Sequence, residues 1–230
     1  GLGEPIAVSS VHGHGTGDLL DAVLEHLPED TEEEIDDSII SVAVIGKPNV
    51  GKSSLINAIS GEERAIVSNI AGTTRDATDT IVENEHGKFV FIDTAGIRRK
   101  NKVHEDIERY SVIRATAAIE RCDVCLLMID ATEGITEQDK KIGGYAHESG
   151  KGVIIVVNKW DLIEKENNTM KEWKEFLEKK LAPFSDIPII FTSVINKQRI
   201  LDVLQAAIRV YQSRKRRIST SDLNDFFLPL

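Results

Sequence analysis

An eight-residue segment near position 50 limits the possible folds of this chain more than any other feature. Residues 46–53 read Gly-Lys-Pro-Asn-Val-Gly-Lys-Ser and match the pattern G-x-x-x-x-G-K-[ST]. The apolar run 39–45 precedes them as a buried strand, and residues 54–59 after them have helical character. A strand, such a loop and a helix form a phosphate-binding loop, because backbone N–H groups and the positive end of the helix dipole surround phosphate oxygens. The sequence therefore predicts a nucleoside triphosphate site.

Each residue type in this loop has a chemical role. The two glycines let the backbone curl around phosphates, Lys52 brings a point charge, and Ser53 offers a hydroxyl to Mg²⁺. We assign Lys52 to catalysis as well as to binding. The predicted nucleotide contacts in this region are Gly46, Lys47, Pro48, Asn49, Val50, Gly51, Lys52, Ser53 and Ser54.

Apolar runs of strand length recur along the chain and alternate with stretches of helical periodicity. The runs are 39–45, 89–92, 124–129, 153–157 and 187–191. Between them, apolar residues recur at three-to-four spacing, and Thr169 with Glu172 predicts a capping box at the start of a helix. This alternation is typical of an α/β domain with a mostly parallel sheet and helices on both faces. We expect that domain to cover residues 39–213.

The first 38 residues differ from the rest. Residues 29–38 are strongly acidic without an apolar face and predict a solvated linker. Residues 1–28 offer one strand (4–10), a turn and one helix, too little to bury a core. They share Pro-Ile, a serine-containing pair and Leu-x-x-Ala with residues 188–208. We therefore expect them to be the last strand and helix of a second copy of the same domain.

Charge and cysteine content exclude several classes of protein. The net charge of −10 argues against binding of nucleic acid through bulk positive charge, and no DNA partner is expected. No apolar run approaches the roughly 20 residues that span a bilayer, so we expect a cytoplasmic protein with no membrane partner. Cys122 and Cys125 have no second pair, and Cys125 lies in an apolar run, which favours buried structural thiols.

Two polar loops carry groups suited to sensing a terminal phosphate. Residues 93–96 follow the run 89–92 and match D-x-x-G, so we expect Asp93 to hold Mg²⁺ through water and the Gly96 N–H to meet the γ-phosphate. Upstream, Thr74 is the preferred further Mg²⁺ ligand and Thr73 is the alternative. Thr74 and Gly96 are assigned to catalysis. The predicted metal ligands are Ser53, Thr74 and Asp93, and the predicted nucleotide contacts here are Asp93, Thr94, Ala95, Gly96 and Ile97.

The identity of the base follows from residues 158–161, Asn-Lys-Trp-Asp, directly after the run 153–157. The Asp161 carboxylate accepts both N1–H and the N2 amine of guanine, whereas adenine has no donor at N1, so GTP is favoured over ATP. We expect Lys159 to lie along the base plane and Asn158 to tie loops together. A backbone N–H of Ser193 or Val194 is expected to meet guanine O6. The predicted base contacts are Asn158, Lys159, Trp160, Asp161, Ser193 and Val194.

Residues 46–54, 71–76, 93–100 and 158–161 closely resemble the Der family of bacterial ribosome-assembly GTPases, also called EngA, and the likeness extends through 98–145. The resemblance implies a protein with two tandem GTPase domains followed by a KH-like domain. The resemblance implies a Ras-like P-loop NTPase fold. It also implies that the chain begins near the end of the first GTPase domain, contains the whole second one, and ends in a basic tail, 214–230, that leads to an absent KH-like domain.

The resemblance further implies a GTP-hydrolysing molecular switch in assembly of the large (50S) ribosomal subunit. Its ligands would be GTP or GDP, Mg²⁺ and K⁺, and its partners the large subunit, its rRNA and the adjacent GTPase and KH-like domains. Ile97 stands where Ras-like proteins have a catalytic Gln, so slow intrinsic turnover is expected. Asn49 matches the position at which relatives bind K⁺, which assigns it to catalysis; the alternative is that Asn49 only hydrogen-bonds its own loop.

Two other functions are weighed against this one. A metabolic or motor ATPase would keep the phosphate-binding loop without Asn-Lys-x-Asp. A nucleotide-sensing interaction module with negligible hydrolysis is compatible with Ile97. The basic runs 98–102 and 214–217 are either rRNA contacts or solvated charged segments.

Overall fold

A computed structural model describes residues 7–9, 15–17, 19, 22, 39–61, 66–68, 79–92, 107–182 and 186–220. The chain divides into two units, Gly1–Asp37 and Ser38–Leu230. The division falls at the end of the acidic segment that the sequence predicts to be a linker.

The second unit is built on a sheet whose strand order, within the described residues, is β2-β3-β4-β1-β5-β6-β7. The strands are β1 (Ile39–Ile45), β2 (Ile66–Ser68), β3 (Thr80–Asn84), β4 (Gly87–Ile92), β5 (Val124–Asp130), β6 (Gly152–Asn158) and β7 (Ile189–Phe191). Neighbours from β4 to β7 pair in parallel, while β2, β3 and β4 pair antiparallel. Four of the five predicted runs lie within strands that pair in parallel with a neighbour, and the fifth, 187–191, contains β7 in its last three residues. The hairpin of β2 and β3 was not predicted.

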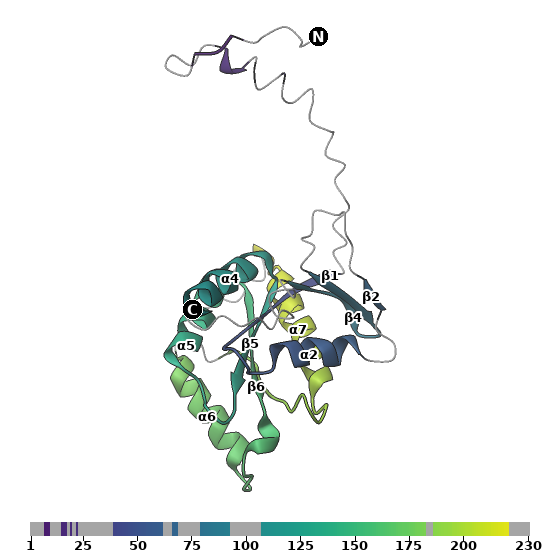
Figure 1. Cartoon of the computed structure of the whole chain (residues 1–230), viewed down its shortest axis with the longest axis vertical. Helices are drawn as coiled ribbons and strands as arrows, with labels where there is room; N and C mark the ends of the chain where they lie inside the picture. Colours follow the sequence, from purple (N-terminus) through teal and green to yellow (C-terminus); the bar gives the residue numbers. More distant parts are fainter. Residues whose placement is uncertain are drawn as a thin grey trace. The chain divides into compact units, whose positions relative to one another are not determined.

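Helices cover both faces of this sheet (Figure 1). They are α2 (Lys52–Ser60), α4 (Ile107–Arg121), α5 (Glu137–Glu148), α6 (Thr169–Leu181) and α7 (Ile200–Lys215), with a 3₁₀ turn η1 (Trp160–Leu162) after β6. The pleat of β1 separates two cores, because successive side chains point to opposite faces. Val42 and Val44 pack with residues of α2 and α7, whereas Ala43 and Ile45 pack with residues of α4, α5 and α6.

The expected α/β architecture is confirmed, and one local prediction is wrong. Thr169 is the first residue of α6, Asn168 is its N-cap, and no side chain caps it. The capping box instead opens α5, where Thr136 and Asp139 exchange hydrogen bonds between side chains and backbone. Both segments place a hydroxyl three residues before a carboxylate, so the pattern alone did not separate them.

The two cysteines are buried and free, as predicted. Burial raises the pKa of Cys122 to about 11 and that of Cys125 well above its usual value. Across the described residues, every helix is too short or too polar to cross a bilayer.

The first unit shows the start of a helix. Residues 16, 17, 19 and 22 are helical, and the Leu19 N–H donates to the Gly15 carbonyl at 3.1 Å. The described residues of the predicted strand, 7–9, are not in a strand. Gly15 has φ +75°, and Arg199, the N-cap of α7, has φ +57°. A left-handed residue therefore precedes the helical residues in both segments, and the repeat itself stays a prediction.

Candidate functional site

The loop between β1 and α2 has a backbone that only glycine tolerates at two positions. Gly46 has φ +139°, and a Cβ there would lie 2.3 Å from the Met128 carbonyl oxygen. Gly51, the N-cap of α2, has φ +106°, and a Cβ there would lie 2.3 Å from Asn158 Nδ2. The loop thus passes close to β5 and β6 at the carboxyl edge of the sheet, where ligands of open α/β sheets bind.

Lys52 begins α2 and folds back over this loop. Its Nζ donates to the carbonyl oxygens of Gly46 at 2.7 Å and Lys47 at 2.6 Å. Burial lowers the pKa of Lys52 from 10.5 to about 8, and the nearby Asp139 opposes the shift only in part. Among the described residues only carbonyl oxygens bond this half-buried ammonium, and a bound anion at the helix N-terminus would stabilise its charge.

The other residues of the loop differ in exposure. Val50 is buried, Ser53 is half-buried, and Pro48, Asn49 and Ser54 are exposed. Asn49 has φ +64°, a left-handed conformation that asparagine tolerates better than most residues.

Lys47, the second residue of the loop, forms an ion pair with Glu133 at 3.1 Å. Glu133 lies in the loop after β5 and was not among the predicted site residues.

Asn158 connects three loops at the end of β6. Its Nδ2 donates to the Val50 carbonyl at 2.8 Å, and its Oδ1 accepts from the Val194 N–H at 3.1 Å and from Thr192 Oγ1 at 3.3 Å. The expectation that Asn158 ties loops together is met by these bonds. A side chain 3% exposed with partners on both sides holds the phosphate-binding loop and the β7 loop in one arrangement.

Lys159 is paired with Asp130, a residue that sequence reasoning missed. Lys159 has φ +61°, and its Nζ forms a short hydrogen bond to the Asp130 carboxylate at the end of β5. Burial favours a raised pKa for Asp130, but hydrogen bonds from Lys159 and Thr132 outweigh it and lower the pKa below its usual value. The sequence signals were an acidic residue at the end of an apolar run and its place within the stretch 98–145 that resembles the Der family.

Asp161 and Trp160 follow in η1 and differ in their surroundings. Trp160 is buried, with its ring centroid 4.4 Å from that of Phe191 and 5.9 Å from that of Trp173. Asp161 is half-buried, and its carboxylate has no hydrogen-bond or ion-pair partner in the described part of the chain. Trp160 therefore anchors the turn, and the Asp161 carboxylate stays available to a ligand.

The N–H groups predicted to meet guanine O6 both have partners within the protein. Ser193 N–H donates to the Gln198 carbonyl at 3.3 Å, and Val194 N–H donates to Asn158 Oδ1. In this arrangement neither is free for a base. The next residue, Ile195, is 84% exposed at the same loop.

Several predicted residues lie outside the described part of the chain. These are Thr73, Thr74, Asp93, Thr94, Ala95, Gly96, Ile97 and the basic run 98–102. Elsewhere, over the residues whose placement is described, no group of three His, Cys, Asp or Glu side chains could hold a metal ion. Of the three predicted Mg²⁺ ligands, the structure thus places only Ser53.

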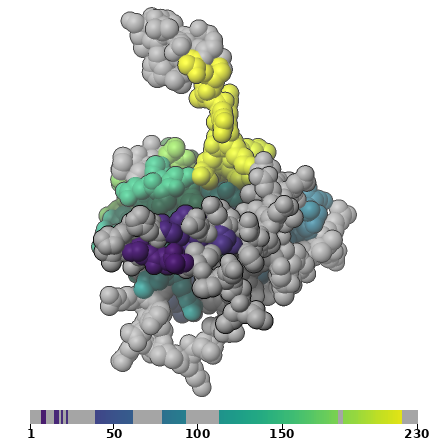
Figure 2. Space-filling model, turned by 90° about the horizontal axis from the view of Figure 1, so that it is seen from above, coloured from purple at the N-terminus to yellow at the C-terminus, as the bar shows by residue number. Residues whose placement is uncertain are grey.

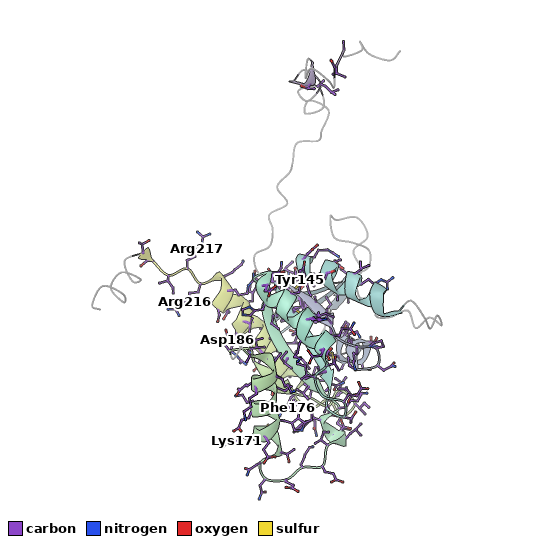
Figure 3. The ribbon with its side chains drawn as sticks, turned by 90° about the vertical axis from the view of Figure 1, so that its left-hand side faces the viewer. Tyr145, Lys171, Phe176, Asp186, Arg216 and Arg217 are labelled. Carbon is purple, nitrogen blue, oxygen red and sulfur yellow. The ribbon has the colours of Figure 1, made fainter. Side chains whose placement is uncertain are left out.

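The second basic run, 214–217, contains two residues that contact their own domain and two that are exposed on the segment after it. Arg214 donates to the Asp123 carbonyl at 2.6 Å, and Lys215 Nζ lies 4.8 Å from the centroid of the Tyr211 ring. Arg216 and Arg217 are exposed on the segment that follows α7, where Figure 3 labels them. Figure 2 shows the C-terminal described residues in yellow. Half of this run therefore packs on its own domain.

Comparison with known proteins places the site in a family. The sequence profile of the family described as 50S ribosome-binding GTPase matches residues 41–159, slightly more than half of the chain. A relative named GTPase Der, from Acetivibrio thermocellus, is 59% identical over 225 residues, which are 98% of this chain and 51% of the relative. The chain spans about half the length of the curated relatives it matches.

Solved structures show the same fold. Era from Aquifex aeolicus, bound to GDP·AlF4⁻, is 29% identical with a TM-score of 0.57 over 75% of this chain and 57% of that protein. Era in complex with MgGDPNP and a segment of 16S ribosomal RNA is 29% identical with a TM-score of 0.56 and the same coverage.

Proposed function

The chain belongs to the family of 50S ribosome-binding GTPases, and from this premise we propose that its second unit binds GTP and hydrolyses it as a molecular switch in assembly of the large ribosomal subunit. The loop 46–53 with its half-buried Lys52 is the observation that carries this proposal. The positive φ angles of Gly46 and Gly51 give the loop its curled backbone, and among the described residues the Lys52 ammonium has only carbonyl oxygens at hydrogen-bond distance.

Guanine is the base that the site fits best. The Asp161 carboxylate, which has no partner in the described part of the chain, has the two acceptor oxygens that N1–H and the N2 amine require. Asn158 stands three residues before Asp161, and its amide joins this segment to the phosphate-binding loop through the Val50 carbonyl and to the β7 loop through the Val194 N–H. The Era structures, which share the fold, contain guanine nucleotides or analogues of them.

The predicted Mg²⁺ ligands Ser53, Thr74 and Asp93 would hold the ion that screens the phosphate charge. Ser53 fits this role, since it is the second residue of α2 and directly follows Lys52. We assign Gly96 to the γ-phosphate and Asn49 to K⁺. The exposed side chain of Asn49 has no hydrogen bond among the described residues, so the alternative that it only bonds its own loop finds no support there.

Ribosomal RNA is the partner that the comparisons favour. The matching family is described as ribosome-binding, and Era was solved with a segment of 16S ribosomal RNA. We place residues 1–28 as the end of a preceding GTPase domain and 214–230 as the link to a KH-like domain. An assembly role of this kind places the protein in the cytoplasm. Arg216 and Arg217 are the exposed cations best placed for RNA after α7.

The test is GTP hydrolysis with Mg²⁺ in KCl and in NaCl, with Lys52→Ala as the inactive control. We expect hydrolysis that depends on Lys52 and is several-fold faster in KCl. Equal rates in the two salts would overturn the role of K⁺. Turnover no faster than that of Lys52→Ala would favour the nucleotide-sensing module, and competition by ADP as strong as that by GDP would favour an ATPase.

A further inference from the structure

The loop after β5 contacts lysines of both predicted nucleotide-binding loops. Asp130 pairs with Lys159 of the base loop, and Glu133 pairs with Lys47 of the phosphate-binding loop. The strand order explains this double contact, because β5 lies between β1 and β6 in the sheet. A nucleotide that extends from the loop after β1 to the loop after β6 passes over the end of β5.

The two ion pairs differ in burial. The Asp130 side chain is 5% exposed, whereas the Lys47 and Glu133 side chains are 35% and 56% exposed. Exposed pairs contribute little, because solvent and salt screen them and two long side chains lose freedom. A buried carboxylate, in contrast, stays paired with its cation, because a buried charge without a partner is strongly destabilising. Only the pair of Asp130 and Lys159 is therefore expected to hold the side chain of its lysine in one position.

Asp130 is itself held in one orientation. Its Oδ1 accepts from the Thr132 N–H at 2.9 Å and from Thr132 Oγ1 at 2.7 Å, which leaves Oδ2 directed at Lys159 Nζ. The backbone adds to this, because Asp130 is in register with Asn158 and the Ala131 N–H donates to the Asn158 carbonyl at 2.9 Å. The carboxylate thus has a fixed position relative to the base loop.

We propose that Asp130 is a positioning residue for guanine recognition, which holds the Lys159 ammonium so that the four-carbon stem of Lys159 lies ready as one wall of the base site. This inference rests on the proposed function. A free lysine stem has many rotamers, and ordering it on binding would weaken affinity. With Asp130 in place that ordering is complete before the nucleotide arrives, as in other preorganised sites.

The test variant is Asp130→Asn, which keeps the shape and the acceptor for Thr132 but removes the charge that holds Lys159. We expect GDP to bind about tenfold to thirtyfold more weakly, equivalent to about 1.4 to 2 kcal/mol. Binding of inorganic tripolyphosphate, which engages only the phosphate-binding loop, is expected to stay within about twofold of wild type. Glu133→Gln removes the exposed pair and is the matched control, with GDP affinity within about twofold of wild type.

A double mutant separates a positioning role of Asp130 from an effect of Asp130 on the stability of the whole domain. In a Lys159→Met background, Asp130→Asn is expected to change GDP affinity by less than about twofold, because its target is gone. Wild-type GDP affinity in Asp130→Asn would overturn the inference. So would an equal loss for GDP and tripolyphosphate, or a full additional loss in the Lys159→Met background.

Two further outcomes are distinguishable. If the wild-type protein itself bound no GDP, the proposed function would fail and not only this inference. If Asp130→Asn did not fold, Thr132→Val would replace it, because it removes one of the donors that orient Asp130. We then expect a loss of about threefold for GDP with tripolyphosphate unchanged, and no loss for GDP would reject the positioning role.

Discussion

Lys52 is expected to take up a proton when the nucleotide binds. Burial lowers the pKa of its ammonium from 10.5 to about 8. Phosphates in the loop would favour the charged form and return the pKa to at least its ordinary value. The bound state then holds more protons than the free state between about pH 8 and pH 10.5, so affinity must fall as pH rises through this window.

The size of the effect follows from a pKa of about 8. At pH 8 half of the free Lys52 is neutral, so GDP binding takes up about 0.5 proton, whereas at pH 7 it takes up about 0.1. The affinity for GDP is expected to fall about tenfold between pH 7 and pH 9. Calorimetric titration at pH 8 in two buffers of different ionisation enthalpy measures the uptake directly. The phosphate groups of GDP contribute little there, because their last pKa lies near about 6.

Lys52→Arg is the matched control, because the guanidinium stays charged at every pH used. The uptake is expected to disappear in this variant. No uptake by the wild type at pH 8 would refute the argument that burial neutralises Lys52. The same uptake in Lys52→Arg would show that another group is responsible, including N1 of the base.

Three other substitutions test the backbone strain of the loop and the contact with the base. Gly51→Ala places a Cβ at φ +106° and 2.3 Å from Asn158 Nδ2, so we expect a loss of about 2 to 4 kcal/mol in urea unfolding. Gly144→Ala in the interior of α5 meets nothing within 4 Å and should instead stabilise by about 0.5 to 1 kcal/mol; equal effects would contradict the assigned strain. Asp161→Ala removes two charge-assisted hydrogen bonds and should weaken GDP at least about 100-fold in a fluorescence titration, with tripolyphosphate unchanged. Retained GDP affinity would remove Asp161 from base recognition.

Local patterns predicted the parts of the site that depend on a few neighbouring residues. The glycines at 46 and 51 were recognisable because their backbone angles are set by the loop itself. The parallel strands were recognisable because continuous apolar runs indicate burial on both faces. The short strands β2 and β3 lacked such a run, and Thr169 was assigned a cap because its spacing to Glu172 resembles one.

Contacts between distant segments could not be read in the same way. Asp130 and Lys159 are separated by 29 residues, and Val50 and Asn158 by 108. Whether such residues meet depends on which strands become neighbours. The same is true of Val194, whose N–H was expected to face a base and instead donates to Asn158.

The sequence by itself determined that the chain forms an α/β domain with a phosphate-binding loop, and it predicted that Asp161 selects guanine, because these depend on residue types at short, fixed spacing. Only the tertiary structure decided that burial lowers the pKa of Lys52 to about 8 and that Asp130 holds Lys159. The physical reason is that burial and long-range pairing are set by the order β1-β5-β6-β7, which brings the ends of distant strands to one edge.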